Sequence, residues 1–288
     1  MTRHMPTVAE RIRLDYDRLT RSEKQLADTL LGNYPVAGLT SITEFAKQAG
    51  VSSPTVIRTV QKLGFSGFPA FQEALRAELS AQFSTPLTKY DQWGIGAPET
   101  HILTRFAAAV HDNIQQSLKL VDHREFDRLA DLLADRKRAT HVIGGRLTRS
   151  IADYLFTHLH ALRPGVFALP GSASLWPQHV LDMRKGDVLV TFDVRRYERN
   201  LGELAQAAHR KGLIVVLFTD RWISPISSIA RHTLPLRIEV PSRWDSAVVT
   251  LFLVEALIAA VIERLWPQAE GRIQELESLF DATNRFRK

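Results

Sequence analysis

Two groups of side chains in this sequence have the types and spacings needed to bind anions. The first combines short hydroxyl and basic side chains within one stretch: Ser52, Ser53, Thr55, Arg58, Thr59 and Lys62. The second combines glycine, hydroxyl and arginine residues that follow two apolar runs: Gly145, Arg146, Thr148, Arg149, Arg195, Arg196 and Tyr197. Guanidinium groups bind phosphate or carboxylate through paired hydrogen bonds, and helix N-termini with hydroxyls approach phosphate closely. Both patterns favour binding chemistry.

The candidates for catalytic and metal-binding roles are weaker. Glu255, His179 and His232 are the available bases for a proton transfer such as aldose–ketose isomerisation. Glu255 lies in a mostly apolar stretch, where burial would raise its pKa, although a paired structural carboxylate fits the same position. His158 and His160 are two residues apart, so a helix would place them on divergent faces, unsuited to a shared metal. We therefore expect no catalytic centre, metal or cofactor, and keep a sugar-phosphate isomerase as the less favoured alternative.

Composition limits the class of protein and its compartment. The chain has 288 residues, of which 45% are hydrophobic and 24% charged, which is enough to bury a core in one or two domains. It has no cysteine, and its N-terminus lacks the continuous apolar segment of a secretory signal, so we expect a cytoplasmic protein. Net charge is +6, but residues 1–80 carry 10 Lys and Arg against 8 Asp and Glu. Bulk charge alone therefore does not identify a nucleic-acid partner.

The spacing of small and β-branched residues predicts how the first group is positioned. Counted from Ile42, Ala46 is the fifth residue, Gly50 the ninth and Val56 the fifteenth. In a helix-turn-helix the fifth side chain lies beneath the crossing helix and must be small, and the ninth residue adopts a left-handed backbone that favours glycine. The fifteenth fills the seam between the helices. The segment therefore predicts two short helices that cross steeply.

The second helix of this pair would present the polar residues outward. Ser52 or Ser53 can cap it, and Pro54 is tolerated in the first turn because its missing N–H has no helical partner there. The polar residues alternate with four that we expect to be buried: Val56, Ile57, Val60 and Leu63. We expect this polar face to contact double-stranded DNA, with Arg58 long enough to reach a guanine. The alternative is a helical hairpin packed inside a bundle.

The remaining sequence divides into two domains and a linker. Residues 1–80 show only helical periodicity, with Thr20 and Glu23, and again Ser41 and Glu44, spaced as helix N-terminal capping pairs. Proline, glycine, serine and threonine are concentrated in residues 84–98, so we place a linker at 81–98.

Residues 99–288 alternate between predicted helices and strands. Two helical stretches, 99–120 and 124–136, precede five β-rich runs at 140–145, 166–170, 187–194, 213–220 and 233–240. Amphipathic helices separate these runs, which predicts a doubly wound α/β domain with a parallel five-stranded sheet. The apolar stretch 246–262 is short for a membrane span and contains a carboxylate, so we expect a buried helix and no membrane partner.

The first 80 residues, which include "VIRTVQKLGFSGFPAFQEAL", resemble the N-terminal domain of RpiR-type (MurR/RpiR) bacterial transcriptional regulators. In that family a sugar-isomerase-like (SIS) domain follows, which matches the α/β domain predicted for residues 99–288. The resemblance implies a sequence-specific regulator that binds operator DNA and senses a metabolite. Family SIS domains hold a sugar phosphate with Gly- and Ser/Thr-rich loops after the first and third strands. The first loop partly matches, with Gly144, Gly145, Thr148 and Ser150.

The third-strand loop departs from the family pattern. Where the family has Ser-x-Ser-Gly-x-Thr, this chain has Phe192, Val194, Arg195 and Tyr197. Arginines are frequent in these loops instead: Arg146, Arg149, Arg195, Arg196, Arg221 and Arg243. We therefore predict that the domain binds a small anionic effector, either a sugar phosphate or a carboxylate. Two alternatives stay open, namely that the arginines pair with nearby acidic residues, or that the domain serves only to assemble a homodimer or homotetramer.

Overall fold

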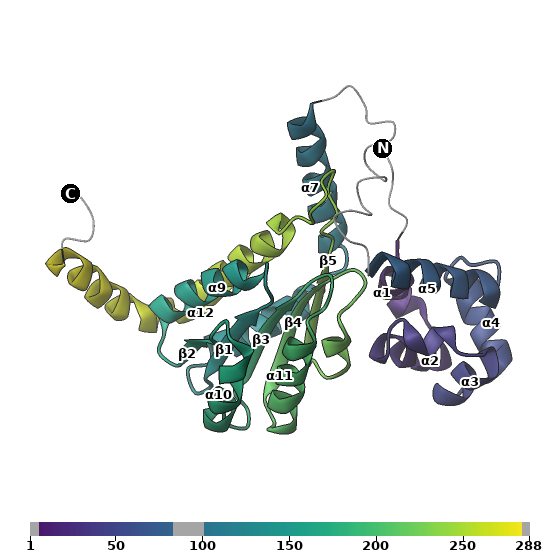
Figure 1. The fold of residues 1–288 in the computed structure, drawn as a ribbon, viewed down its shortest axis with the longest axis horizontal. Coiled ribbons are helices and arrows are strands. Elements are labelled where there is room, and N and C mark those ends of the chain that lie inside the picture. Colours follow the sequence, from purple (N-terminus) through teal and green to yellow (C-terminus); the bar gives the residue numbers. More distant parts are fainter. Residues whose placement is uncertain (1–5, 83–100, 284–288) are drawn as a thin grey trace. The chain divides into compact units, whose positions relative to one another are not determined.

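A computed structural model describes residues 6–82 and 101–283 (Figure 1). It divides into two compact units. The first comprises Met1–Leu120, Thr219–Ser228 and Pro235–Ser246, and the second comprises Val121–Phe218, Ile229–Leu234 and Ala247–Lys288. The expected linker at 81–98 lies outside the described residues, except that residues 81 and 82 end a helix.

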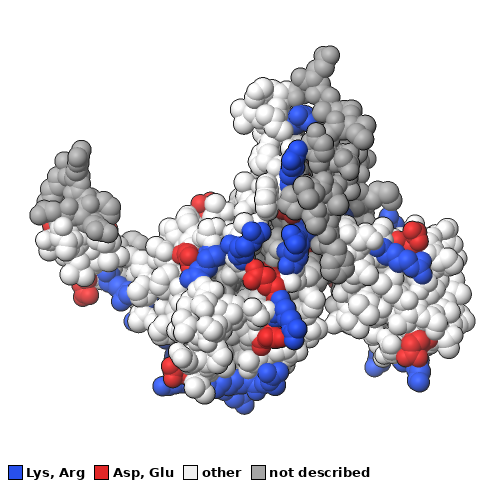
Figure 2. Space-filling model, in the orientation of Figure 1, with Lys and Arg blue, Asp and Glu red and all other residues white. Residues whose placement is uncertain are grey.

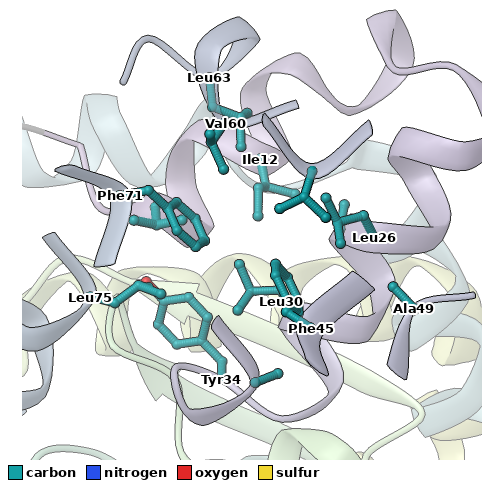
Figure 3. Packing of buried hydrophobic residues seen from close by; sticks show 14 of the residues in the cluster. Ile12, Leu26, Leu30, Tyr34, Phe45, Ala49, Val60, Leu63, Phe71 and Leu75 are labelled. Atoms are coloured by element: carbon teal, nitrogen blue, oxygen red, sulfur yellow. The ribbon is translucent and has the colours of Figure 1, made fainter. Parts of the chain in front are cut away.

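The first unit is built from helices. They are α1 (Val8–Asp15), α2 (Arg21–Gly32), α3 (Ile42–Gln48), α4 (Ser53–Lys62), α5 (Phe68–Gln82) and α7 (Ile102–Leu118). The predicted capping pairs are confirmed, since Thr20 N–H donates to Glu23 Oε2 at 2.8 Å and Glu44 N–H donates to Ser41 Oγ at 3.2 Å. Figure 3 shows the core that α1–α5 enclose, lined by Ile12, Leu26, Leu30, Tyr34, Phe45, Ala49, Val60, Leu63, Phe71 and Leu75.

The α/β part contains a five-stranded sheet with the order β2-β1-β3-β4-β5. The strands are β1 (Thr140–Gly144), β2 (Val166–Ala168), β3 (Val188–Asp193), β4 (Ile214–Asp220) and β5 (His232–Leu236). Strand β1 is parallel to both neighbours, with Thr140 opposite Val166 on one side and Val188 on the other. The central strands β1 and β3 are buried along their whole length, whereas the edge strand β2 is partly exposed. The predicted parallel sheet and its five strands are confirmed.

Helices cover both faces of this sheet (Figure 1). They are α8 (His123–Ala134), α9 (Arg149–Leu162), α10 (Trp176–Asp182), α11 (Arg199–Arg210) and α12 (Val248–Ala282). Helices α8 and α9 pack with α12 on one side, while α10 and α11 lie together on the other. Apolar strands need this double cover, which explains their continuous hydrophobic runs. The apolar stretch 246–262 lies largely within α12, and no helix in the described part of the chain is long and apolar enough to cross a bilayer.

Candidate functional site

The turn between α3 and α4 has the predicted geometry. Gly50 has a φ of +64°, in the left-handed region that glycine adopts without a steric penalty. Its N–H donates to Lys47 O at 3.1 Å, and Val51 N–H reaches back to Ala46 O at 2.9 Å. These bonds close the end of α3, as in a glycine-terminated helix cap. The chain can therefore reverse direction within four residues and start α4.

The seam and the start of α4 are also as predicted. Ala46 is 4% exposed and Val56 is 0% exposed, so a small and a β-branched side chain meet where the helices cross. Ser52 caps α4, because its Oγ accepts the Thr55 N–H at 3.4 Å, and Pro54 is the second helical residue. The first backbone N–H groups of a helix have no partner within the helix, and the Ser52 cap satisfies one of them. The helix therefore begins at a defined residue.

The outer face of α4 carries an interconnected set of polar groups. The Ser52 and Thr55 hydroxyls are 2.9 Å apart, and Arg58 Nη2 donates to Thr55 Oγ1 at 3.2 Å. Ser52 and Arg58 are exposed, whereas Ser53 and Thr55 are half-buried. Lys62 is exposed, but its Nζ donates to Glu23 Oε2 and to Arg18 O, both at 2.8 Å.

The sequence predicted the wrong exposure for two residues of α4. Thr59 was expected on the outer face, but it is 2% exposed and its Oγ1 donates to Thr55 O at 2.8 Å. Ile57 was expected to be buried, but it is 40% exposed. Helical spacing explains both, because Thr59 lies three residues after the buried Val56, whereas Ile57 lies about 100° from it around the axis. Thr59 is therefore a packing residue in this conformation.

The loop between β1 and α9 requires its first glycine. A Cβ on Gly144 would lie 2.5 Å from Thr148 O and 2.8 Å from Arg149 N, so a side chain does not fit beside the start of α9. The Thr148 hydroxyl donates to Phe192 O at 2.7 Å, which ties this loop to the end of β3. The loop therefore partly resembles a phosphate-binding loop, but the Thr148 hydroxyl already donates its hydrogen bond to the Phe192 carbonyl.

The loop after β3 brings further candidate residues beside this one. Arg195 and Arg196 have φ values of +41° and +55°, a region that costs non-glycine residues about 1 kcal/mol or more. Arg195 and Tyr197 are half-buried, and Arg196 is exposed. The loop ends at Glu198, whose Oε1 accepts the Arg146 N–H at 2.6 Å. The two predicted loops thus meet, and the residue that joins them, Glu198, was not among the predicted site residues.

Arg149 points from α9 toward a third loop. Its Nε donates to Asp153 Oδ1 at 2.8 Å, and its Nη1 lies 3.7 Å from the position a Cβ on Gly171 would take. This Nη1 is buried and, among the described residues, has no hydrogen-bond partner. A guanidinium N–H in this condition is suited to an anionic oxygen. Of the predicted effector arginines, Arg149 therefore retains buried donor capacity.

Arg221 has a different role from the one its loop position suggested. Its side chain is 5% exposed, and its Nη2 donates to Glu10 Oε2 at 2.9 Å. Arg237 Nε and Nη2 bind the same carboxylate at 2.8 and 2.9 Å, and Glu239 lies 3.4 Å from Arg221. For Arg221 the alternative of pairing with acidic residues is therefore correct, although the partners differ from those nearby in sequence. In the face drawn in Figure 2, basic and acidic side chains likewise lie next to one another.

Two of the three catalytic candidates, Glu255 and His232, are each hydrogen-bonded to another side chain. Glu255 was expected to be buried, but it is exposed, and its Oε1 accepts from Tyr154 Oη at 3.0 Å. That hydrogen bond raises the pKa of Tyr154. His232 pairs through Nδ1 with Glu125 of α8. Within the described ranges, no three His, Asp or Glu side chains are grouped as metal ligands.

Two family models match separate parts of the chain. A helix-turn-helix domain of the rpiR family matches residues 7–82, and a SIS domain matches residues 132–260. Among curated proteins, the HTH-type transcriptional regulator HexR of Pseudomonas aeruginosa is 28% identical over 270 residues, covering 90% of each chain. HexR of Escherichia coli is 27% identical over 238 residues, covering 82% of this chain and 79% of the relative.

Solved structures share the fold at low identity. The sugar isomerase domain of an RpiR transcription factor from Sphaerobacter thermophilus matches with a TM-score of 0.58 and 20% identity, covering 62% of this chain and 99% of that one. The Vibrio vulnificus NanR protein, described as complexed with ManNAc-6P, matches with a TM-score of 0.54 and 20% identity, covering 96% and 99%. With an rpiR-family helix-turn-helix joined to a SIS domain in one polypeptide, the chain belongs to the RpiR family of helix-turn-helix transcriptional regulators.

Proposed function

We propose that the protein binds operator DNA sequence-specifically through α4 and senses a small anionic metabolite through its SIS domain. The main support for DNA binding is that the first turn of α4 begins at an exposed residue. Ser52 caps this turn, and the left-handed turn at Gly50 sets the direction of the helix. The family membership supports the same function. As a regulator of this kind the protein would act in the cytoplasm, as a homodimer or homotetramer whose paired reading helices address half-sites.

The residues of α4 divide into different expected contacts. Arg58 is exposed and long enough for a bidentate contact to guanine, worth about 1–3 kcal/mol of discrimination. Ser52, Ser53 and Thr55 surround the helix N-terminus, where short hydroxyls and backbone N–H groups suit a DNA phosphate. Lys62 would contact a phosphate only by exchanging its bond to Glu23, so its net contribution is smaller. Thr59 is buried, so we expect it to make no contact with DNA.

The effector would bind where the loops after β1 and β3 meet. Arg195, Arg196 and Tyr197 supply cationic and hydroxyl groups there, and the Gly145–Thr148 loop supplies backbone donors beside Arg146. Arg149 adds a guanidinium from the start of α9, directed toward the neighbouring loop that contains Gly171. A sugar phosphate or a carboxylate fits these groups by charge and hydrogen bonding. The ManNAc-6P named for NanR supports a phosphorylated sugar as one class of ligand.

One observation favours a second function for this domain. The Glu198 carboxylate already binds a backbone N–H of the β1–α9 loop, where a ligand anion would bind. A domain that has lost its ligand, and serves only to assemble subunits, could keep this contact permanently. An isomerase is not favoured, because Glu255 is exposed and hydrogen-bonded to a tyrosine. A regulator also needs no proton-transfer base.

Selection of genomic fragments on the purified chain tests the DNA-binding part, and the genes beside the selected fragments then guide the choice of effector. We expect enrichment of a few fragments with a two-fold symmetric motif, whose binding weakens as salt rises. Enrichment of no fragment over random DNA would contradict the proposal.

The effector part is tested with the double variant Arg195→Ala/Arg196→Ala. We expect this variant to bind the selected operator normally and to lose the response to the effector in a reporter assay. A double variant that responds like the wild type would contradict the arginine site. A domain that only assembles subunits would show no rise in melting temperature with any sugar phosphate or carboxylate, because a ligand stabilises only a native state that binds it.

A further inference from the structure

The loop between β1 and α9 already holds a carboxylate that belongs to the chain itself. Glu198 Oε1 accepts the Arg146 backbone N–H at 2.6 Å. The same oxygen lies 2.7 Å from the position that a Cβ on Gly145 would take, so the missing side chain lets the carboxylate approach the backbone. Glu198 is exposed, and a dissolved anion can therefore reach this contact.

The β3–α11 loop is shaped so that Glu198 reaches this place. Two consecutive residues, Arg195 and Arg196, adopt left-handed backbone angles, which turn the chain sharply after β3. The Glu198 N–H donates to Asp193 Oδ1 at 3.3 Å, which ties the end of the turn to its beginning. Two arginines in costly conformations thus precede the acidic side chain of Glu198, which turns back to the β1–α9 loop.

A ligand anion and the Glu198 carboxylate need the same donor. The Arg146 N–H lies ahead of the N-terminus of α9, where backbone dipoles favour negative charge. A phosphate placed there would meet the Glu198 charge at close range, and two like charges repel each other in one site.

We propose that Glu198 is an internal occupant of the β1–α9 loop, and that the anionic group of an effector binds there only by displacing it. This inference rests on the proposed sensing function and names the residue that lowers the affinity of its site for anions. Glu198 then sets a threshold, because weakly binding anions leave its carboxylate in place. The exposure of the contact keeps that threshold modest, since solvent screens the charge.

The experiment measures the melting temperature of the full chain at increasing concentrations of inorganic phosphate. Sodium chloride holds the ionic strength constant. The proteins compared are the wild type, Glu198→Gln, Glu198→Ala and Glu203→Gln. Glu203 is the matched control. It lies on α11 and is paired with Arg199 of the same helix at 2.9 Å, and its neutralisation changes the net charge equally. We expect both Glu198 variants to reach half-maximal stabilisation at three- to tenfold lower phosphate than the wild type and Glu203→Gln.

Three results would overturn the inference. They are equal phosphate midpoints in all four proteins, the absence of any phosphate response, and an equal gain in Glu203→Gln, which would show a general charge effect. Glu198 is exposed, so both of its variants are expected to fold. If Glu198→Ala fails to fold, Glu198→Gln still provides the test, because glutamine preserves the shape of the side chain. Operator binding is measured on the same samples. If one of these three results is found while the wild type binds its operator, only the role of Glu198 is refuted. If the wild type binds no operator, the regulator function is refuted.

Discussion

Replacing Glu10 with glutamine should destabilise the first unit far more than an exposed charge would. The Glu10 side chain is 3% exposed and accepts hydrogen bonds from two buried guanidiniums, those of Arg221 and Arg237. Removing the charge leaves both arginines buried without their shared counter-ion, and breaking a buried ion pair in this way costs about 3–5 kcal/mol. Each kcal/mol corresponds to roughly 2–4 °C in melting temperature for a chain of this size. We expect the melting temperature of Glu10→Gln to fall by roughly 6–20 °C.

Glu23→Gln is the matched control for this measurement. Glu23 occupies the same capping position in α2 that Glu10 occupies in α1, since the N–H of Thr20 donates to Glu23 and that of Thr7 to Glu10. Its ionic partner, Lys62, is 37% exposed, so loss of this pair should cost less than about 1 kcal/mol. The difference between the two variants therefore isolates the arginine contacts from the cap.

The assay is urea and thermal unfolding followed by circular dichroism and tryptophan fluorescence. Trp222 is 4% exposed, and the guanidinium of Arg221 lies 5.7 Å from its ring centroid, so its emission reports on this part of the first unit. The two units are fitted as separate transitions, because one two-state transition cannot be assumed for them. Equal shifts for Glu10→Gln and Glu23→Gln would refute the reasoning that a buried carboxylate compensates the two arginines.

Three further changes test other parts of the structure. Gly144→Ala should destabilise the α/β part by about 2 kcal/mol or more, because its Cβ would overlap backbone atoms of Thr148; an unchanged unfolding midpoint would show that the β1–α9 loop is looser than described. Arg163→Met should lower stability by about 2–4 kcal/mol in urea unfolding, because Arg163 is 0% exposed and donates to carbonyls and to a threonine hydroxyl; a loss under 0.5 kcal/mol, roughly that of a surface change, would contradict this. Burial lowers the pKa of His141 despite the nearby Asp187, so its unfolded state binds more protons and stability should fall as pH drops below about 6.5. His141→Phe should flatten that part of the pH–stability curve, and a curve identical to the wild type would rule His141 out as its source.

Local features of the fold were predictable because neighbouring residues determine them. The turn at Gly50 and the cap at Ser52 depend on backbone angles and donors within a few positions, and the structure has both. The five strands were recognisable because burial on both faces makes a strand continuously apolar. The end of the last strand was predicted wrongly. The final run was expected to reach Val240, but β5 ends at Leu236.

The errors concern side chains whose environment distant residues decide. The partner of Arg221 is Glu10, 211 positions away, and no local pattern indicates that pairing. Glu198 reaches the β1–α9 loop after a turn in which two residues adopt left-handed angles that arginine rarely takes, and no local pattern predicts those angles. Thr59 was misplaced for a simpler reason, since its hydroxyl suggested an outer position although its spacing from Val56 follows the buried stripe. The capping sequence Thr7-x-x-Glu10 was visible, but it shows only the local half of what Glu10 does.

The most direct test of the central claim compares operator and random duplexes bound by Arg58→Ala. Arg76→Ala is the control, because Arg76 is an exposed arginine on α5 paired with Glu73 at 3.5 Å, and its loss changes the charge equally. If α4 contacts the bases, Arg58→Ala should weaken operator binding by about 5- to 150-fold, matching 1–3 kcal/mol, and leave random-DNA binding nearly unchanged. Arg76→Ala should weaken both only slightly. Operator binding by Arg58→Ala equal to that of the wild type, or equal losses on both duplexes, would contradict base recognition by Arg58 of α4.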